Sequence, residues 1–570
     1  MNGRCFSCFA LLGSLLLLGG GWIAAQEGLA QLTPRQSVSL PMDTSELMSA
    51  SGNCGVCHTN LSDQSGADVS IDSDWRSAMM ANSARDPFFL AQVADEVEAF
   101  PHLKEVIEEK CANCHMGMAH VQADADGEMP SVLGDGFLSE DHPLNGLAMD
   151  GVSCTLCHQI EDEQLGEPAT FSGEYPIDLE TPRPDRKAYG PFENPVAQSM
   201  QSFSGFLPLY DEHISGSRLC ATCHTLYTPF VDENGEVAGT FPEQTPYLEW
   251  LHSRYSQPGE ERQDCQDCHL PKAEGGVVTS IIPSNLEARE PFSQHHFVGG
   301  NVTMLKMLQR HGQELQVTAS SEHYDETIAR TQNQLEENTL TLAIENPRYQ
   351  EGSLGFDLSI EVLTGHKFPT GFPSRRAWLH LIVRDAAGSV VFESGAPNED
   401  GSIAGVASET DSSLYTPHID LIAESSDVLI YESIMMSLEG SPTFQLLRGS
   451  QYVKDNRLLP AGFDKATAGD DFAVQGAARD DENFTGGGDC VSCEIAVAPG
   501  SGPWTVEAQM LYQSVSYQFV QGLRGGEHQL ITRMNDWFAQ SPPEAVAVGN
   551  QALRTIDAQT GIHAWPGHQN

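Results

Sequence analysis

Basic residues are scarce in this sequence. Lysine and arginine together number 30, against 79 aspartates and glutamates, and the formal net charge is -49. A surface of this sign repels nucleic acid and anionic lipid and attracts cationic molecules. The composition therefore excludes a nucleic-acid-binding protein and predicts partner proteins with basic docking surfaces.

Long apolar runs are lacking after the first 30 residues, where no segment approaches 18 uninterrupted apolar residues. The N-terminus itself has an arginine, an apolar run over residues 6–25 and then small residues, which is the layout of a secretory signal peptide. The alternative is an uncleaved anchor, but Gly19–Gly21 weaken a permanent span. We expect residues 1–30 to be removed after Ala25 or Ala30, leaving an exported protein in the periplasm or at the cell exterior, without membrane association.

Cysteine is absent outside Cys-x-x-Cys pairs: all 14 cysteines fall in seven such pairs. Five of the pairs are followed at once by histidine, although only 20 of the 570 residues are histidine. The five motifs are Cys54, Cys57, His58; Cys111, Cys114, His115; Cys154, Cys157, His158; Cys220, Cys223, His224; and Cys265, Cys268, His269.

Cys-x-x-Cys-His is the attachment signal for c-type haem. Two thiols three residues apart bond the two vinyl groups of one porphyrin, and the adjacent histidine becomes the proximal iron ligand. Zinc ribbons pair two Cys-x-x-Cys knuckles about 15–20 residues apart, and exported proteins use disulfide frameworks. Neither alternative explains five histidines at the same place. The motifs therefore predict five haem c groups with iron.

The two remaining pairs lack the histidine. Cys5 and Cys8 leave with the signal peptide, and Cys490 and Cys493 are followed by Glu494. For the second pair we expect a local disulfide or two plain thiols.

The chain divides into unlike halves. Residues 31–320 hold all five haem motifs and helical stretches such as 74–100 and 301–312, with a hairpin turn at Asn234-Gly235. About one haem per 50 residues leaves too little polypeptide to wrap each porphyrin separately, so neighbouring haems must share pocket walls. Residues 321–540 contain alternating strands at 355–363, 376–395 and 504–515. We expect an α+β fold, a helix- and loop-rich pentahaem domain followed by a haem-free β sandwich, with 541–570 as a tail.

Several strings resemble one known family, the exported multihaem c-type cytochromes of the cytochrome c-554 type that carry a C-terminal β domain with a Gly-His-x-x-Pro-Thr-Gly loop. The matching strings are WRSAMMANSARDPFF, CHMGMA, DGVSCTLCHQI, LCATCHTLYTP, FPEQTPYLEW, HHFVGGN, TGHKFPTGFPSRRAW and YVKDNRLLPAGFDK. The resemblance implies electron transfer outside the cytoplasm, although several relatives of this broad class are enzymes.

The second axial position of each iron decides between electron transfer and substrate binding. Proposed distal ligands are His142 and His213, which lie shortly before a haem motif, and His366, in a rigid turn rich in Gly and Pro. By resemblance to a His-x-Phe-x-Gly pattern, His295 is a fourth, preferred over His296. Met80, or its neighbour Met79, is a candidate for the fifth, and His102, His120, His311 and His418 are further candidates.

We expect an electron-transfer protein rather than an enzyme. One alternative is a haem enzyme that reduces or oxidises a small nitrogen or sulfur species at an open iron, with Arg375 and Arg376 as candidate substrate-binding residues. Another is a subunit of an extracellular cytochrome filament, in which homo-oligomers stack through the β domain.

Overall fold

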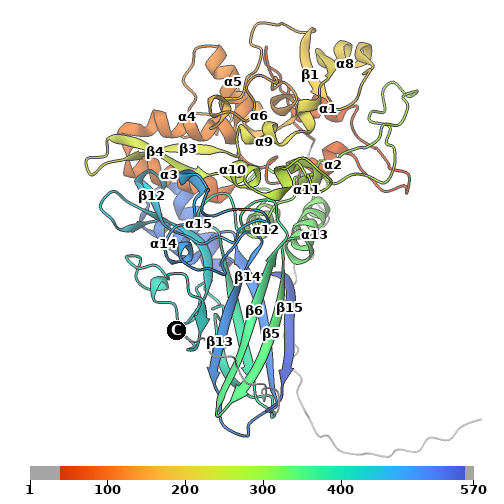
Figure 1. Ribbon diagram of the computed structural model, residues 1–570. Helices are drawn as coiled ribbons and strands as arrows, with labels where there is room; N and C mark the ends of the chain where they lie inside the picture. The colour runs from red at the N-terminus through yellow and green to blue at the C-terminus, as the bar shows by residue number, and fades with distance from the viewer. Residues whose placement is uncertain (1–38, 559–570) are drawn as a thin grey trace, which may run out of the picture.

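The computed structural model describes residues 39–558 and has an α+β fold. The helical first half lies above an elongated β half, as Figure 1 shows. The expected signal peptide, residues 1–30, lies outside the described residues.

The first half is built from short helices joined by loops. Its helices are α1 (Ser51–Gly55), α2 (Ile71–Trp75), α3 (Pro87–Ala99), α4 (Lys104–His115), α5 (Gly117–Ala125), α6 (Asn145–Met149), α7 (Cys154–Cys157), α8 (Ala197–Ser204), α9 (Ser217–Ala221), α10 (Pro246–Leu251), α11 (Cys265–His269) and α12 (Val302–Arg310). The predicted hairpin at Asn234-Gly235 is confirmed, since it joins antiparallel strands β3 (Leu226–Val231) and β4 (Val237–Gln244). A second pair, β1 (Arg186–Gly190) and β2 (Phe206–Tyr210), is parallel.

The helix expected over 74–100 is interrupted. Residues 76–86 form turns, and α3 begins only at Pro87. Proline suits the first helical position because it has no N–H to leave unpaired. Asp86 caps the same end, with its carboxylate accepting the N–H groups of Phe88 and Phe89. The local start signal therefore outweighs the helical periodicity that precedes it.

The second half contains two sheets. The seven-stranded sheet has the order β11-β10-β7-β14-β15, with β12 on β10 and β8 on β7, and the four-stranded sheet has the order β5-β6-β13-β9. The strands are β5 (Leu340–Gln350), β6 (Ser353–Val362), β7 (Arg376–Arg384), β8 (Val390–Ser394), β9 (Leu421–Ile422), β10 (Ile430–Met436), β11 (Pro442–Thr443), β12 (Gln451–Asp455), β13 (Gly488–Ala496), β14 (Trp504–Gln513) and β15 (Val546–Ile556). The strands predicted at 355–363, 376–395 and 504–515 are confirmed as β6, β7 with β8, and β14.

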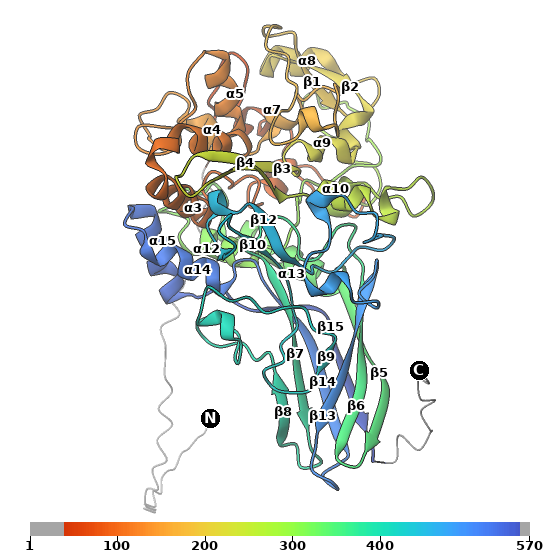
Figure 2. The ribbon, with the colours of Figure 1, turned by 60° about the vertical axis from the view of Figure 1, so that its left-hand side comes forward.

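Alternating side chains of the two sheets share one core. Leu358 and Ile360 of β6 belong to the same buried cluster as Val383 of β7 and Val506 of β14. This is the sandwich arrangement expected from strands with one apolar face. Figure 2 shows the long strands of both sheets running side by side below the helical half.

The β half extends further along the chain than expected. Strand β15 lies within the segment 541–570, for which the sequence predicts a tail, and pairs with β14 from Trp504↔Ile556 to Tyr512↔Val546. Its apolar residues Val548, Ala552 and Ile556 are buried. Burial against β14 therefore makes this segment part of the sheet.

Three helices join the two halves. Helix α13 (Ser321–Glu337) precedes β5, and α14 (Tyr517–Gly522) and α15 (Gln529–Gln540) lie between β14 and β15. Helix α15 packs beside α3 of the first half, and Phe88 contacts both Phe538 of α15 and Phe372 of the β half. Within residues 39–558, no helix has the length and apolar character needed to cross a membrane.

Candidate haem-binding cavity

Each Cys-x-x-Cys-His motif lies on or at the end of a short helix. The five helices are α1, α4, α7, α9 and α11. In a helical turn, side chains at positions i and i+3 project from the same side. Both thiols of a motif are therefore presented together, and the histidine comes next on the turn.

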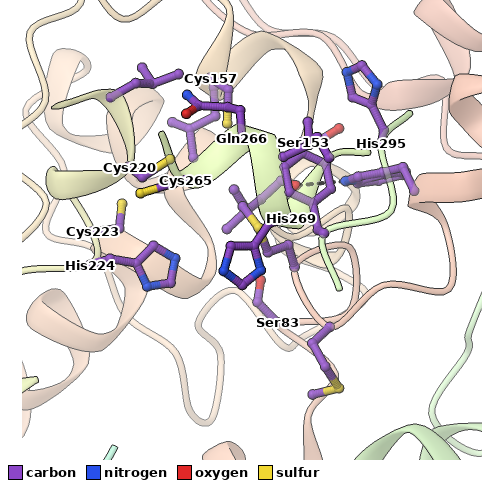
Figure 3. A pocket seen from close by; sticks show the side chains of 18 of the residues that line it. Ser83, Ser153, Cys157, Cys220, Cys223, His224, Cys265, Gln266, His269 and His295 are labelled. Carbon is purple, nitrogen blue, oxygen red and sulfur yellow. Dashed lines mark hydrogen bonds between the residues drawn. The ribbon is translucent and has the colours of Figure 1, made fainter. Parts of the chain in front are cut away.

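One large cavity contains all five motifs. Its volume is about 1690 Å³, and the five motif histidines and all ten motif cysteines line it together with residues of the β half such as His366, Arg375 and Tyr512. Pockets for one small molecule have volumes of roughly 300–1,000 Å³. The space is therefore larger than a single-ligand site, and Figure 3 shows motif side chains from several chain segments converging on it.

Thiols of different motifs lie against one another. The thiol pairs Cys54–Cys154, Cys114–Cys223 and Cys220–Cys265 are hydrogen-bonded. These hydrogen bonds raise the thiol pKa of the first member of each pair. Figure 3 shows the last pair, Cys220 and Cys265, side by side. The attachment points of the first and third, the second and fourth, and the fourth and fifth motifs are thus adjacent in space.

Backbone carbonyls orient four of the five motif histidines. The Nδ1–H groups donate over 2.5–3.2 Å to the carbonyls of Thr279, Ser83, Tyr189 and Val298, from His58, His115, His158 and His269 in that order. A donating Nδ1 leaves Nε2 without a proton, as an iron ligand must be.

Burial also keeps these imidazoles neutral. It lowers the pKa of every motif histidine, to about 4 for His115 and His224. It does the same for His295, whose pKa is about 4, and for His366. A neutral imidazole is the form that coordinates a metal.

His269 and His366 face each other across the cavity. Their ring centroids are 6.2 Å apart and their planes differ by 18°. His366 lies in the loop between β6 and β7, and its Nδ1–H donates to the Lys367 carbonyl over 2.9 Å. The histidine of the last motif therefore meets a histidine from the β half.

His158 and His295 make a second pair of the same kind. Their ring centroids are 6.5 Å apart, with an angle of 23° between the planes. The neighbouring His296 points elsewhere, since its Nε2 lies 3.4 Å from an Asp74 carboxylate oxygen. The preference for His295 over His296 thus matches the placement of the two rings.

The structure brings neither His142 nor His213 to the cavity lining. The His142 Nδ1 accepts the N–H of Leu144 over 3.1 Å, which places the ring proton on Nε2. The His213 Nε2–H donates to the Ile160 carbonyl over 2.8 Å, and its Nδ1 lies 2.8 Å from an Asp211 carboxylate oxygen. Short sequence distance from a motif therefore does not by itself bring a histidine to the cavity, and iron ligation by His142 or His213 stays a prediction.

The methionine and arginine candidates differ in whether they line the cavity. Met79 and Met80 line the cavity. Arg375 lines it too and donates to the Thr370 carbonyl. Arg376 is buried in an ion pair with Glu409, so its role is structural. Two acids that sequence reasoning missed, Glu96 and Glu243, also line the cavity, and burial raises the pKa of each to about 8.

The residues present fit c-type haem. Two metal–imidazole bonds of about 2 Å each, plus the distance from each nitrogen to its ring centre, account for a centroid separation of roughly 6 Å. Both histidine pairs have this separation. The paired thiols, the free Nε2 atoms and the volume of the cavity agree with that assignment.

Cys490 and Cys493 lie outside this cavity. Both are free thiols on strand β13, with Cys490 partly exposed and Cys493 buried in the sandwich core. Residues three apart in a strand point to opposite faces. Of the two alternatives left open for this pair, the structure therefore has plain thiols.

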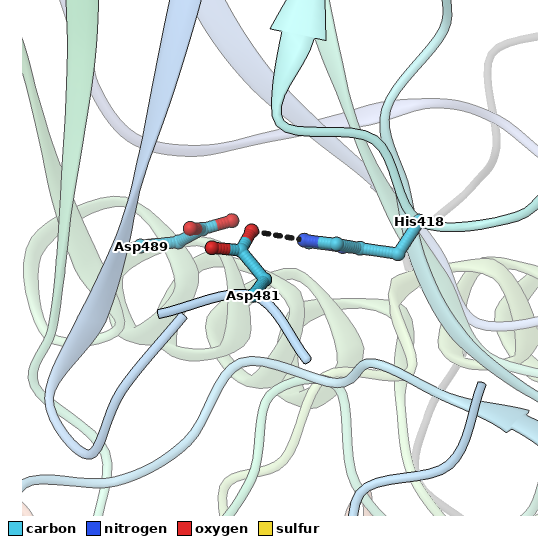
Figure 4. Close-up of side chains that lie close together, drawn as sticks. All are labelled: His418, Asp481 and Asp489. Atoms are coloured by element: carbon cyan, nitrogen blue, oxygen red, sulfur yellow. Dashed lines mark hydrogen bonds and ion pairs between the residues drawn. The ribbon is translucent and has the colours of Figure 1, made fainter. Parts of the chain in front are cut away.

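A second group of ligand-type side chains lies in the β half: His418, Asp481 and Asp489 (Figure 4). The Asn456 amide N–H donates to Nδ1 of His418, and the Asn456 orientation follows from its bonds to Ile430 and Glu432. The proton of His418 is therefore on Nε2, from which it donates to Asp481 over 3.0 Å. This arrangement is a hydrogen-bonded network rather than a metal site, because Nε2 has no lone pair to offer.

No family model and no curated protein matches this chain. Among solved structures, it is similar to a penta-heme cytochrome c552 from Thermochromatium tepidum, with 14% sequence identity and a TM-score of 0.44 over 85% of this chain and 96% of that chain. The likeness is too loose to assign a family, so the cysteines and histidines of this chain themselves carry the functional interpretation.

Proposed function

We propose that this protein is an exported multihaem cytochrome that transfers electrons through five covalently bound c-type haems. The observation that carries the proposal is the convergence of five Cys-x-x-Cys-His motifs on one cavity in which two motif histidines face a second histidine. Its membership of the cytochrome c-554 type is part of this proposal and rests on the resemblance of the sequence.

Bound haem supplies a one-electron iron couple. The residues of the chain tether it through the thiols, orient it through the Nδ1–H bonds and surround it with mostly apolar side chains that exclude water. Adjacent thiols of different motifs support haem groups close enough to exchange electrons. The net charge of -49 favours redox partners with basic docking surfaces outside the cytoplasm.

The test is a reductive titration of the purified holoprotein combined with its intact mass. Five attached haems and five electron equivalents per chain support the proposal. A lower haem number, or haem that dissociates on denaturation, would contradict covalent attachment at five motifs.

An enzymatic function is a second candidate, and one observation favours it. Among the described residues, only His295 and His366 line the cavity in addition to the five motif histidines. His58, His115 and His224 therefore need methionine, another group or an open position. Arg375 lines the same cavity as His224, where a substrate-binding cation would be needed.

Carbon monoxide binding to the reduced protein distinguishes the two functions. No spectral shift would show that every iron is closed and would exclude the enzyme. A shift, followed by turnover of nitrite, hydroxylamine or sulfite, would support catalysis at an open haem.

A further inference from the structure

The loop that carries His366 is anchored by a residue of the other half. Glu249 belongs to α10 and is fully buried. Its Oε2 accepts the backbone N–H of Lys367 over 3.1 Å and the hydroxyl of Thr370 over 2.6 Å. One carboxylate of the first half thus holds the loop immediately beyond His366.

Glu249 is part of a buried charged network, which we define as Glu249, Lys367, Asp455 and Arg457. Arg457 lies 2.9 Å from Glu249 Oε1 and donates to both oxygens of Asp455 over 2.8–2.9 Å. Lys367 Nζ donates to Asp455 over 2.7 Å. The side chains are at most 6% exposed.

The network is balanced, with two positive and two negative charges. Buried ions are stable only when paired, and removing one partner leaves an uncompensated charge in the interior. Burial raises the pKa of Asp455, but Arg457 and Lys367 outweigh that effect and hold it at about 2. The four groups therefore fix each other and, through them, the position of the loop relative to α10.

A short chain of bonds connects this network to the ring of His366. Glu249 accepts the N–H of Lys367, and the carbonyl of the same Lys367 accepts the Nδ1–H of His366. The orientation of the Lys367 backbone therefore sets the direction in which His366 Nε2 points. A partner that holds the Nδ1 side is how proteins orient metal-binding histidines.

We propose that Glu249 is a positioning residue for His366: through the Lys367 backbone it aims the imidazole at His269 and so keeps the haem between them closed. The inference rests on the proposed function, because it requires that His269 and His366 share an iron. It adds that a residue of the haem half, far from His366 in the sequence, controls that coordination.

The experiment compares Glu249→Gln with His366→Ala in the full-length holoprotein. His366→Ala identifies the spectrum of the haem that loses its sixth ligand. Glu249→Gln keeps the shape of the side chain but places an amide against Arg457. It should bind carbon monoxide at that same haem at least tenfold faster than the native protein, with the same spectral change.

Three further proteins separate positioning from general destabilisation. Thr370→Val removes one bond to Glu249 and no charge, and should give the same change with smaller amplitude, even if Glu249→Gln assembles poorly. Glu409→Gln breaks an equally buried pair with Arg376 beyond the end of the loop, and should leave carbon monoxide binding unchanged. The double variant Glu249→Gln/His366→Ala should match His366→Ala alone.

Two results would overturn the positioning role by itself. One is native carbon monoxide kinetics in both Glu249→Gln and Thr370→Val while His366→Ala opens a haem, which would leave the proposed ligation intact. The other is an equal effect of Glu249→Gln with and without His366. A native spectrum of His366→Ala would instead reject the ligation itself and the positioning role with it.

Discussion

His269 and His366 come from opposite halves of the chain, yet their imidazole planes lie within 18° of parallel at a centroid distance of 6.2 Å. Direct stacking brings aromatic rings closer than this, as Phe89 and His115 show at 3.6 Å. The separation is that of two ligands of one metal. The β half is thus part of the proposed cofactor site.

Replacing His366 by alanine should convert one haem from low spin to high spin, since no other histidine faces His269 among the described residues. EPR and carbon monoxide difference spectra measure the change. His142→Ala, which removes a histidine outside the cavity lining, is the control and should resemble the native protein. Unchanged spin states in His366→Ala would reject the pairing.

The neighbours His295 and His296 offer a matched comparison. His295→Ala should open the haem attached through Cys154 and Cys157, because His295 faces His158. His296→Ala should leave all spin states unchanged and only loosen the contact with Asp74. High-spin iron in His296→Ala but not in His295→Ala would reverse the assignment.

Thiol labelling tests haem attachment and the free thiols together. In the unfolded holoprotein only Cys490 and Cys493 should react, two thiols per chain, because thioether bonds leave no thiol at the ten motif cysteines. In the folded protein the partly exposed Cys490 should react first, and the buried Cys493 should be protected. Twelve reactive thiols after unfolding would contradict attachment.

Glu243 should make the folded protein less stable as pH rises. Burial raises its folded-state pKa to about 8, above the ordinary value of a glutamate. Between about pH 4.5 and 8 the folded state therefore binds more protons than the unfolded state, so stability falls across this window and levels off above it. The loss is on the order of a few kcal/mol, and a pH series of thermal unfolding measures it.

Glu243→Gln should reduce the slope of that pH dependence, because the amide does not titrate, while Glu96 keeps its own contribution. Glu236→Gln, at an exposed position just before β4, is the control and should keep the native slope. An identical slope in the native protein and Glu243→Gln would show that Glu243 does not contribute to the pH dependence.

Sequence reasoning predicted the features that depend on near neighbours in the chain. The Cys-x-x-Cys-His spacing determines a helical turn with two thiols on one side. The alternation in 355–363 determines a half-buried strand, which is β6. Sequence reasoning failed where contacts between distant residues determine the structure. Residues 541–570 contain β15, which is a strand only because β14 pairs with it.

The proposed ligand histidines also fall into two groups, one identified by the local sequence and one placed by tertiary contacts. The sequence by itself identified the five proposed proximal histidines, because each follows its cysteines directly and local geometry suffices. Only the tertiary structure decided which other histidines face them. His142 and His213 are close to a motif in sequence but do not line the cavity. His366 reaches His269 because Glu249, Asp455 and Arg457 bury its loop and hold it against α10. Coordination across the cavity depends on packing between the two halves, and no local pattern encodes that.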